Sequence, residues 1–334
     1  MIFVTGGTGL VGSHILLRLS QRGEKFKALK RAASSMNVCK SVFAHYNAHD
    51  LFAQINWVDG DVNDIPSLEN GMLDSDLVLH CAAIVSFQAS DAKLLKKVNI
   101  EGTANIVNVA ISKGIEKLGY VSSISALGRN STEGMVDEEC HFKATKLDGN
   151  YALSKYYAEQ EVWRASQEGL DVVIVNPSVI LGPGDWSSGS SQIFQKIYSG
   201  LDFYAPGSTG YVDVLDVANS LVSLLLSNIK NERFIVNGAN LKYRDCFDRI
   251  AVAINKPKAT IKVTPFLKEI AWRLEGIRTF FTGNKPLITR DTANSAMTDS
   301  SYSTAKIRNA IQFNFTDIDV TIKKYADWFI ADQT

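Results

Sequence analysis

The sequence has few cysteines, and they lie far apart. The four among its 334 residues are Cys39, Cys81, Cys140 and Cys246, and no two of them form a CxxC pair. Zinc sites and disulfide frameworks need closely spaced cysteines, so this spacing argues against both. It is typical of reduced, mostly buried thiols. We therefore expect no metal site and a cytoplasmic protein.

An excess of charge of either sign is also missing. Lysine plus arginine and aspartate plus glutamate both number 35. Nucleic acids and anionic membranes attract a basic excess, so we predict neither as a partner. The longest apolar runs, such as Val172 to Val175 and Leu221 to Leu226, are far too short to span a bilayer. A strand expected from Ile2 leaves no room for a signal peptide.

What the first half does contain is a regular alternation of short β-branched runs and longer helical periods. Strands that are apolar on both faces and separated by helices imply a parallel sheet covered on both sides. The predicted fold class is α/β, a doubly wound parallel sheet of the Rossmann type. We expect strands at Ile2–Thr5, Phe26–Lys30, Ile55–Val58, Asp76–Cys81, Lys117–Ser122 and Asp171–Asn176, and helices over about 11–22, 91–113 and 151–168.

The regularity weakens after Gly182-Pro183-Gly184, although a helix at about 216–227 and a strand at Phe234–Asn237 are still expected. We predict a dinucleotide-binding domain of residues 1–180 plus about 212–240. A smaller, mostly C-terminal substrate-binding lobe takes about 181–211 and 241–334. Its segment Phe266–Phe281 has apolar residues at helical spacing. This pattern predicts an amphipathic helix, with a lid preferred over a membrane contact.

A glycine-rich segment, Gly6-Gly7-Thr8-Gly9-Leu10-Val11-Gly12, stands between the first expected strand and helix. Gly6 allows the tight turn, Gly9 lets the backbone approach a pyrophosphate, and Gly12 permits close packing of helix on sheet. The anion then lies at a helix N-terminus, where free N–H groups and the dipole favour it. This context predicts a dinucleotide cofactor.

Two cations, Lys30 and Arg31, stand at the end of the second expected strand, and no acidic residue follows until Asp50. A carboxylate here usually holds the ribose hydroxyls of NAD, whereas an arginine accommodates the 2′-phosphate of NADP. We therefore predict NADP, with NAD as the alternative; a solvated strand end is the other reading of the pair. Asp61 has two compatible predicted roles, a bond to the adenine amino group and a cap on the next helix.

Tyr151 and Lys155 are four residues apart in Tyr-Ala-Leu-Ser-Lys and share one helix face. A phenol with a pKa of about 10 transfers protons poorly near neutrality, and a nearby ammonium lowers that pKa. The preceding stretch, Gly119 to Gly128, places serine hydroxyls at the carboxyl edge of the sheet, where ligands of α/β proteins bind. The pattern predicts hydride transfer coupled to proton transfer.

Together these motifs resemble an extended short-chain dehydrogenase/reductase, of the NAD-dependent epimerase/dehydratase family. The likeness covers nearly the whole chain, and its Asn-Pro-Ser and Gly-Pro-Gly stretch is most similar to dihydroflavonol-reductase-like and 3-beta-hydroxysteroid-dehydrogenase-like members. The matching segments are Thr5–Gly12, His80-Cys81-Ala82-Ala83, Asn99-Ile100-Glu101-Gly102-Thr103, Val121-Ser122-Ser123, Tyr151–Lys155, and Asn176-Pro177-Ser178 through Gly182-Pro183.

The resemblance implies a role for each matching residue. Ser123 would bond the substrate oxygen, Tyr151 would transfer the proton, and Lys155 would hold the nicotinamide ribose and tune Tyr151. Ser122 and Ser125 are the rivals of Ser123. The remaining implied residues are Asn99, structural and near the proton path; His80, structural at a strand end; and the cofactor contacts Thr8, Leu10, Val11, Val62, Ala82, Ala83, Pro177 and Val179.

Three features bear on the substrate. Ile124-Ser125 follows Ser123, where resembling dehydratases carry an Asp-Glu pair, so dehydration is not expected. Between Asn176 and Asp216 the only cation is Lys196, which is little help for the diphosphate of a nucleotide sugar. The exception would be a cation of the lobe that folds back over the diphosphate: Arg244, Lys256, Arg273 or Arg290. The rings predicted to line an apolar pocket, or only to pack the lobe, are Phe87, Trp186, Phe203 and Tyr204.

We therefore predict an NADP-dependent oxidoreductase acting on an apolar or aromatic ketone or aldehyde, or on the alcohol in reverse, with Tyr151 as general acid and base. The alternatives are a nucleotide-sugar epimerase with tightly bound NAD and an NADP-sensing regulator without turnover. The helices at 91–113 and 151–168 resemble those that pair across a dimer interface in the family, so we expect a homodimer.

Overall fold

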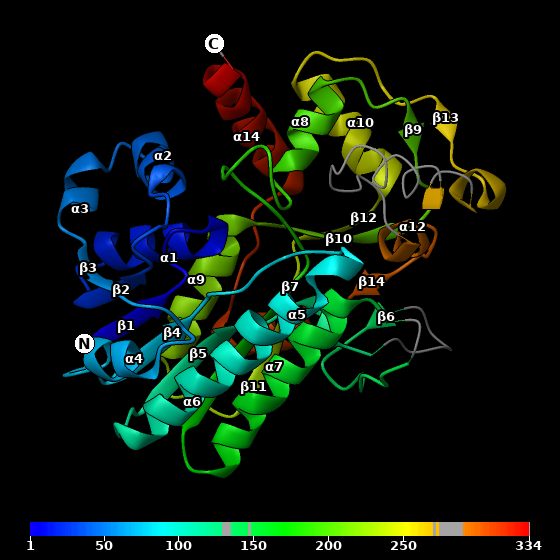
Figure 1. Ribbon diagram of the computed structural model, residues 1–334. Coiled ribbons are helices and arrows are strands. Elements are labelled where there is room, and N and C mark those ends of the chain that lie inside the picture. The colour runs from blue at the N-terminus through cyan, green and yellow to red at the C-terminus, as the bar shows by residue number, and fades with distance from the viewer. Residues whose placement is uncertain (129–134, 146–147, 270–271, 274–289, 334) are drawn as a thin grey trace.

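A seven-stranded parallel sheet forms the centre of the protein, in the strand order β11-β7-β5-β4-β1-β2-β3 (Figure 1). The computed structural model describes residues 1–128, 135–145, 148–269, 272–273 and 290–333. The predicted doubly wound α/β fold is confirmed. Its strands are β1 (Ile2–Thr5), β2 (Phe26–Lys30), β3 (Asn56–Asp59), β4 (Leu77–His80), β5 (Lys117–Val121), β7 (Asp171–Pro177) and β11 (Glu232–Val236).

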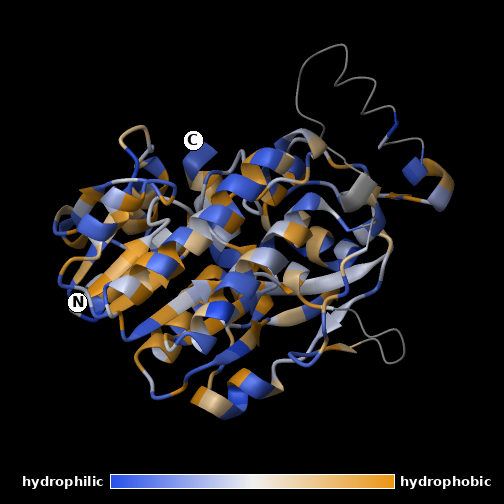
Figure 2. Cartoon of the chain, turned by 60° about the horizontal axis from the view of Figure 1, so that its bottom comes forward, coloured by the Kyte–Doolittle hydropathy of each residue, from blue (hydrophilic) through white to orange (hydrophobic). Residues whose placement is uncertain are grey.

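Helices cover both faces of this sheet. One face carries α1 (Leu10–Gln21), α2 (Asn37–His45), α3 (His49–Ala53) and α9 (Val214–Leu225), and the other carries α4 (Ile65–Gly71), α6 (Gly102–Ser112) and α7 (Asn150–Gln167). In β7, Val173 and Val175 face the hydrophobic core under α1 and α9, whereas Val172 and Ile174 face the core under α6 and α7. Because both faces are buried, the strand is apolar throughout, and hydrophobic colour gathers on the sheet in Figure 2.

The helix predicted over 91–113 is not uniform. It begins with a 3₁₀ turn, η1 (Ala89–Asp91), continues as α5 (Ala92–Leu95), and passes through a π-helical turn, η2 (Lys96–Glu101), into α6. Asn99 lies in the π-helical turn, where its side chain bonds the backbone of Ile84. A single π-helical turn cannot be recognised from the spacing of apolar residues in the sequence. Such turns are frequent at functional sites.

In the second half of the chain, some elements pack on or extend the central sheet and the others form a separate lobe (Figure 1). The predicted helix near 216–227 is α9, which begins two residues earlier, and the predicted strand is β11, which ends at Val236. A three-stranded sheet, β12-β10-β8, and a third core under α8, α10 and α14 form the lobe. Its elements are β8 (Val179–Leu181), α8 (Gln192–Tyr198), β10 (Ser208–Asp213), β12 (Ala239–Lys242), α10 (Tyr243–Ala253) and α14 (Ile318–Gln333).

Short elements complete the described chain: η3 (Ile124–Ala126), β6 (Met135–Val136), β9 (Phe203–Tyr204), β13 (Ile261–Lys262), α12 (Arg290–Ser295), β14 (Ser301–Tyr302) and α13 (Ala305–Ile311). Most of the predicted lid helix, Phe266–Phe281, lies outside the described residues. The two-part division of the chain at residues 180, 212 and 240 stays a prediction. In the described part of the chain, no helix is both long and apolar enough to cross a membrane.

Candidate active site

The glycine-rich loop joins the end of β1 to the start of α1 and lies against the end of β4. Gly6 has φ +73°, and a Cβ added to it would lie 2.6 Å from the backbone nitrogen of Ala82. A Cβ on Gly12 would lie 2.1 Å from the carbonyl oxygen of Gly6. At Gly9 the nearest atom to an added Cβ is the Gly6 carbonyl oxygen at 3.5 Å, an ordinary van der Waals contact, so a side chain fits there. The loop is therefore closed against the sheet and open on its outer side.

These features fit the pyrophosphate of a dinucleotide. Helix α1 has no acidic residue in its first turn, and Gly9 immediately before it is exposed. N–H groups at the start of a twelve-residue helix can therefore receive an anion. The predicted contacts Thr8, Leu10 and Val11 lie in the same turn and are half-buried.

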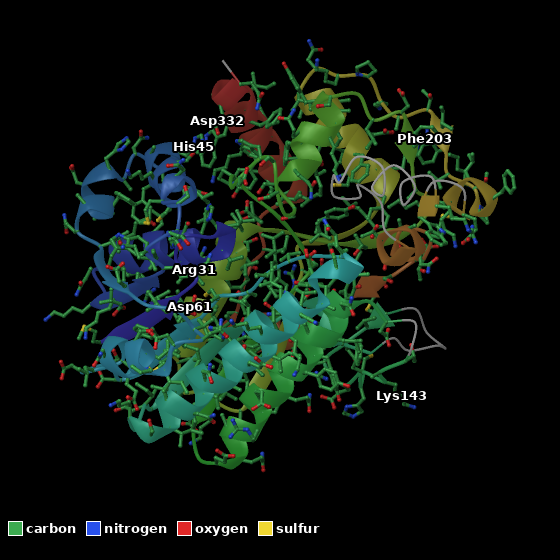
Figure 3. All side chains as sticks on the ribbon, viewed as in Figure 1. Arg31, His45, Asp61, Lys143, Phe203 and Asp332 are labelled. Atoms are coloured by element: carbon green, nitrogen blue, oxygen red, sulfur yellow. The ribbon has the colours of Figure 1, made fainter. Side chains whose placement is uncertain are left out.

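The predicted adenosine end is built by residues that follow β2 and β3 (Figure 3). The Lys30 ammonium forms an ion pair with Asp59 of the neighbouring strand, while Arg31 is exposed. Asp61 accepts hydrogen bonds from the backbone and side-chain nitrogens of Asn63, at 2.8 and 3.1 Å. The helix-cap prediction for Asp61 is wrong, because α4 begins only at Ile65 and Asp61 closes the turn before it.

Other predicted cofactor contacts also lie at the carboxyl edge of the sheet. Ala82 and Ala83 follow β4, Pro177 ends β7, and Val179 begins β8. Val62 packs against Gly102, where an added Cβ would lie 2.8 Å from its side chain. The carboxyl ends of parallel strands meet at one edge, so these residues lie around the same end of the sheet as the glycine-rich loop.

Ser123, Tyr151 and Lys155 come together at this edge from two elements. Ser123 follows β5, and the other two lie on successive turns of α7. The Ser123 side chain lies near enough to the Tyr151 phenol to affect its pKa, and the ring of Phe87 contacts the Tyr151 ring edge-on with centroids 5.3 Å apart. Burial raises the pKa of Tyr151, and the interaction with Ser123 partly offsets that rise. The phenol is therefore a proton donor at neutral pH.

Lys155 is turned toward the sheet. Its Nζ donates to the Tyr120 hydroxyl at 2.9 Å and to the Val121 carbonyl at 2.7 Å. Burial outweighs any lowering of the Tyr151 pKa by this ammonium, so the predicted tuning of Tyr151 by Lys155 stays a prediction. Burial lowers the pKa of Lys155 to about 8, against the opposing charge of Glu159.

The rival serines have other partners. The Ser122 hydroxyl donates to the Glu159 carboxylate at 2.6 Å. The backbone nitrogen of Ser125 donates to Ser123 Oγ at 3.1 Å, which orients that hydroxyl. Of the three serines, Ser123 is the one that affects the pKa of the Tyr151 phenol.

Two buried polar residues fix the surroundings. Asn99 accepts a hydrogen bond from the Ile84 nitrogen at 2.8 Å and donates to Ser154 of α7 at 3.0 Å, so it ties the loop after β4 to α7. His80 is fully buried between the hydroxyls of Thr5 and Thr103, at 2.7 and 3.0 Å. Burial lowers the pKa of His80 to about 3, so it is neutral and structural, as predicted.

Of the four predicted pocket rings, Phe87 contacts Tyr151. Trp186 packs on Phe194 and Phe329 in the lobe core and donates to Asp332 at 2.7 Å, so its pocket assignment is wrong. Phe203 lies 48% exposed on β9, on the far side of the lobe in Figure 3. Tyr204 lies under the Arg244 guanidinium, 4.5 Å from its ring centre.

The lobe cations have local partners as well. Arg244 also lies 3.7 Å from Asp248, Lys256 lies 4.1 Å from the ring centre of Tyr198, and Arg273 lies 2.6 Å from Glu269. The side chain of Arg290 is outside the described residues. Burial lowers the pKa of Lys196.

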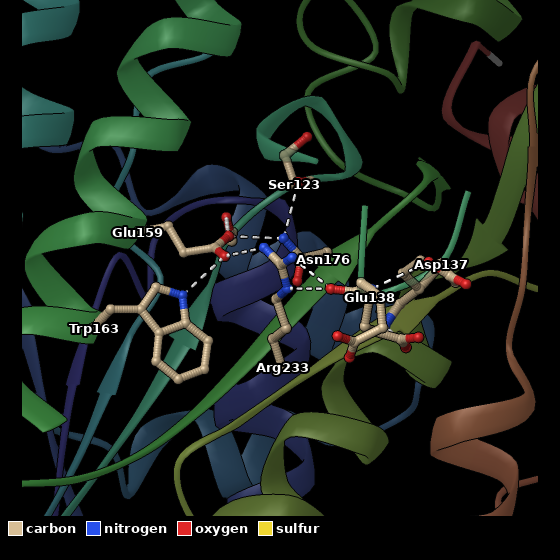
Figure 4. A network of polar contacts seen from close by, with 10 residues as sticks. Ser123, Asp137, Glu138, Glu159, Trp163, Asn176 and Arg233 are labelled. Carbon is tan, nitrogen blue, oxygen red and sulfur yellow. Dashed lines mark hydrogen bonds and ion pairs between the residues drawn. The ribbon is translucent and has the colours of Figure 1, made fainter. Parts of the chain in front are cut away.

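Sequence reasoning missed a polar network beneath the site (Figure 4). It centres on Glu159, which binds Ser122, Asn176 and Arg233. Tyr120, the acceptor for Lys155, was also missed. Their positions in the sequence could have identified both residues. Glu159 lies one turn after Lys155 on the same face of α7, and Tyr120 lies on β5 three residues before Ser123.

A seven-stranded doubly wound sheet, a glycine-rich loop and a serine, tyrosine and lysine at one edge define an extended short-chain dehydrogenase/reductase. The chain belongs to the NAD dependent epimerase/dehydratase family, whose model matches residues 2–236. It is therefore an NAD(P)-dependent enzyme of that type.

Similar proteins include both reductases and epimerases. The chain is 29% identical to a Synechocystis protein named "Putative dihydroflavonol 4-reductase", over 98% of this chain and 94% of that one. It is 26% identical to a UDP-glucose 4-epimerase of Vibrio cholerae, over 81% and 80%. The crystal structure of gox2253 superposes with a TM-score of 0.82 at 27% identity, over 99% and 98%.

Proposed function

We propose that this protein is an NADP-dependent oxidoreductase that interconverts an apolar or aromatic ketone or aldehyde with the alcohol. The observation that carries the proposal is the Tyr151 phenol, whose pKa the nearby Ser123 side chain lowers and whose ring is contacted edge-on by the exposed ring of Phe87. A hydroxyl pair beside an aromatic ring offers polar contacts for a carbonyl oxygen and an apolar surface for its substituents.

The chemistry divides between cofactor and protein. A bound nicotinamide dinucleotide supplies the hydride in the reductive direction. Ser123 holds the substrate oxygen by a hydrogen bond, and Tyr151 gives its phenolic proton to that oxygen as negative charge develops there. Because burial raises the pKa of Tyr151, the phenol is protonated at neutral pH, which favours reduction over oxidation. Lys155, one helical turn after Tyr151, supplies a positive charge that stabilises the phenolate left behind.

Two observations support the finer assignments. Arg31 is exposed just beyond β2, where it is free to meet a 2′-phosphate, whereas Lys30 already has Asp59 as a partner. Arg244, Lys256 and Arg273 have partners within the described part of the lobe, which makes these three cations less available to a second diphosphate.

The second candidate is a nucleotide-sugar epimerase with tightly held NAD. It uses the same three residues, and the similarity to the Vibrio cholerae UDP-glucose 4-epimerase supports it. A sensor that binds NADP without turnover is the third candidate, and the neighbouring Ser123 and Tyr151 argue against it, since a sensor has no need of a proton donor.

The deciding experiment is native mass spectrometry and absorbance of the purified protein, followed by titration with NADPH and NADH. A reductase releases its cofactor in each cycle, so we expect protein without retained nucleotide and tighter reversible binding of NADPH. Turnover is then followed at 340 nm with aromatic and aliphatic aldehydes and ketones. Tightly retained NAD, with interconversion of UDP-sugars and no net change in absorbance, would establish the epimerase instead.

We also propose a cytoplasmic homodimer. No disulfide joins any two of the four cysteines, which suits a reducing compartment. A groove of about 420 Å³ runs between α5, the π-helical turn and α7. Apolar residues such as Leu95 and Leu153 line it together with polar ones, which include Lys96 and Glu161. A mixed groove of this kind between two helices suits the matching helices of a second copy.

A further inference from the structure

Tyr120 has no assigned role, yet its hydroxyl is one of the two groups that bind the Lys155 ammonium. Tyr120 is 1% exposed and Lys155 is 2% exposed, so the contact is shielded from water. The Nζ–hydroxyl distance is 2.9 Å, and Nζ also lies 4.6 Å from the centre of the Tyr120 ring. An ammonium buried this deeply needs acceptors in place of water.

Glu159 supplies the negative charge on the other side. It is 1% exposed and lies one turn beyond Lys155 on α7. Its carboxylate accepts a hydrogen bond from the Asn176 side chain at 2.8 Å and forms an ion pair with Arg233 at 3.1 Å (Figure 4). Asn176 also donates to the Ser123 carbonyl at 3.1 Å, so Glu159 reaches the backbone of the serine beside Tyr151.

Other titratable groups around Lys155 are neutral or already paired. Cys81 and His80 face it from the end of β4; burial raises the pKa of Cys81 to about 12 and lowers that of His80 to about 3. Burial also raises the pKa of Tyr120. Glu159 is therefore the negative charge that faces Lys155 at neutral pH, although its pairing with Arg233 weakens its field.

We propose that Tyr120 and Glu159 are positioning residues of this enzyme, which fix the Lys155 ammonium one helical turn after Tyr151 and keep it protonated. Tyr120 does this through its hydroxyl, together with the Val121 carbonyl, and Glu159 through its charge and its links to Ser122 and Asn176. The role in turnover rests on the proposed function, whereas the effect on Lys155 is a property of the protein alone.

The test uses two conservative variants, Tyr120→Phe and Glu159→Gln. The first removes only the hydroxyl that Lys155 binds. The second removes the charge and also replaces one of the two acceptor oxygens, which receive donors such as Ser122 and Arg233, by an amide NH2. The matched controls are Tyr325→Phe, which removes a buried hydroxyl bonded to Asp213 at 2.7 Å, and Glu168→Gln, at the exposed end of α7. Circular dichroism and thermal melting check that each variant folds.

The first readout is the pKa of Lys155 in the protein without cofactor, from NMR of its ε-carbon with lysine-labelled protein. Removing an acceptor or a counter-charge disfavours the ammonium, so we expect each test variant to lower this pKa by about one unit, and the controls to leave it unchanged. An unchanged pKa in folded Tyr120→Phe and Glu159→Gln would overturn the proposal.

The second readout is the pH profile of kcat/KM with a carbonyl substrate. We expect the alkaline limb to move to lower pH in both test variants, by the same amount as the Lys155 pKa, with full recovery of activity below the limb. A moved pKa with an unmoved limb would overturn the positioning role. Wild-type protein without turnover would instead refute the proposed function, while the NMR result would still report on the contact.

Discussion

Tyr151 lies where its phenol stays protonated at neutral pH, because burial outweighs the interaction with Ser123. A protonated phenol serves the reductive direction without any change in protonation before substrate arrives. The Lys155 charge lowers the pKa of Tyr151 by stabilising the phenolate formed during turnover. The bond of Lys155 to the Tyr120 hydroxyl holds that charge in place.

Tyr151→Phe removes the proton donor and keeps the ring against Phe87. We expect kcat to fall by about 10²- to 10⁴-fold, the usual contribution of general acid catalysis, with the Kd for NADPH nearly unchanged. Steady-state kinetics and fluorescence titration measure the two quantities. Tyr157→Phe, on the same helix and 45% exposed, is the control and keeps full activity. Equal loss of turnover and of cofactor binding would mean that Tyr151 is structural.

Arg31→Asp exchanges the exposed cation beyond β2 for a carboxylate. We expect the Kd for NADPH to rise by about tenfold or more, because the 2′-phosphate loses a charge-assisted contact, while NADH binds as well as before or better. Titration of both nucleotides gives the ratio. Lys25→Asp makes the same change of charge before the start of β2 and leaves the ratio alone. A ratio that Arg31→Asp does not alter would remove the case for NADP.

At the scale of elements, two glycines at the junction of β1 and α1 have different roles. Gly12 is needed for packing, and we expect Gly9 to be needed for the cofactor to approach. Gly12→Ala places a Cβ 2.1 Å from the Gly6 carbonyl oxygen, so backbone must move. We expect it to lower the free energy of unfolding by about 1–3 kcal/mol, as overpacking does. Gly9→Ala makes only an ordinary van der Waals contact, 3.5 Å from the Gly6 carbonyl oxygen, at a φ of −94°, so its stability stays near wild type.

The same pair predicts opposite results for the cofactor. Gly9→Ala folds normally, yet its methyl group occupies the side from which the pyrophosphate approaches, so NADPH affinity drops. Urea unfolding and NADPH titration on both variants give the comparison. A Gly9→Ala protein that binds NADPH as tightly as wild type would show that the pyrophosphate does not lie over this turn.

On the scale of the whole molecule, two neutral histidines make stability depend on pH. His14 in α1 and His80 in β4 are fully buried, and burial lowers the pKa of each to about 3. The unfolded chain protonates them near its ordinary pKa of 6.5, so stability is full above pH 6.5 and declines as pH falls toward 3. At pH 5 each histidine costs about 2 kcal/mol.

His14→Gln isolates one of these contributions. Burial raises the pKa of Asp216 to about 6, and protonation of that carboxyl stabilises the fold below pH 6, which offsets part of the loss. The difference between variant and wild type cancels this offset. We expect the free energy of unfolding, measured with urea, to fall between pH 7 and pH 5 by about 2 kcal/mol less in His14→Gln than in wild type. An equal loss in both proteins would mean that His14 titrates normally in the fold.

The proposed dimer gives a prediction for the assembled molecule. Tyr157→Glu places a charge in the groove between α5 and α7, so we expect sedimentation to change from dimer to monomer, because an unpaired charge at the core of an interface is strongly unfavourable. Leu73→Glu, at a residue 48% exposed after α4, leaves the mass unchanged. A wild-type monomer across micromolar concentrations would refute the dimer.

The sequence by itself determined the parallel sheet, the glycine-rich loop and the shared helix face of Tyr151 and Lys155. Each of these depends on local patterns: apolar runs of period two or 3.6, and glycine at a turn that no Cβ fits. The same local character explains why strand and helix ends were predicted to within one or two residues of where they lie.

Tertiary structure alone decided which side chains meet. Lys155 bonds Tyr120 and Val121 because burial leaves its ammonium only nearby acceptors, and those come from a strand more than thirty residues earlier in the chain. Trp186 joins the lobe core for a similar reason, since the helices α8 and α14 converge on it. Periodicity records that a residue is apolar or charged, and packing between distant segments sets its partner and hence its pKa.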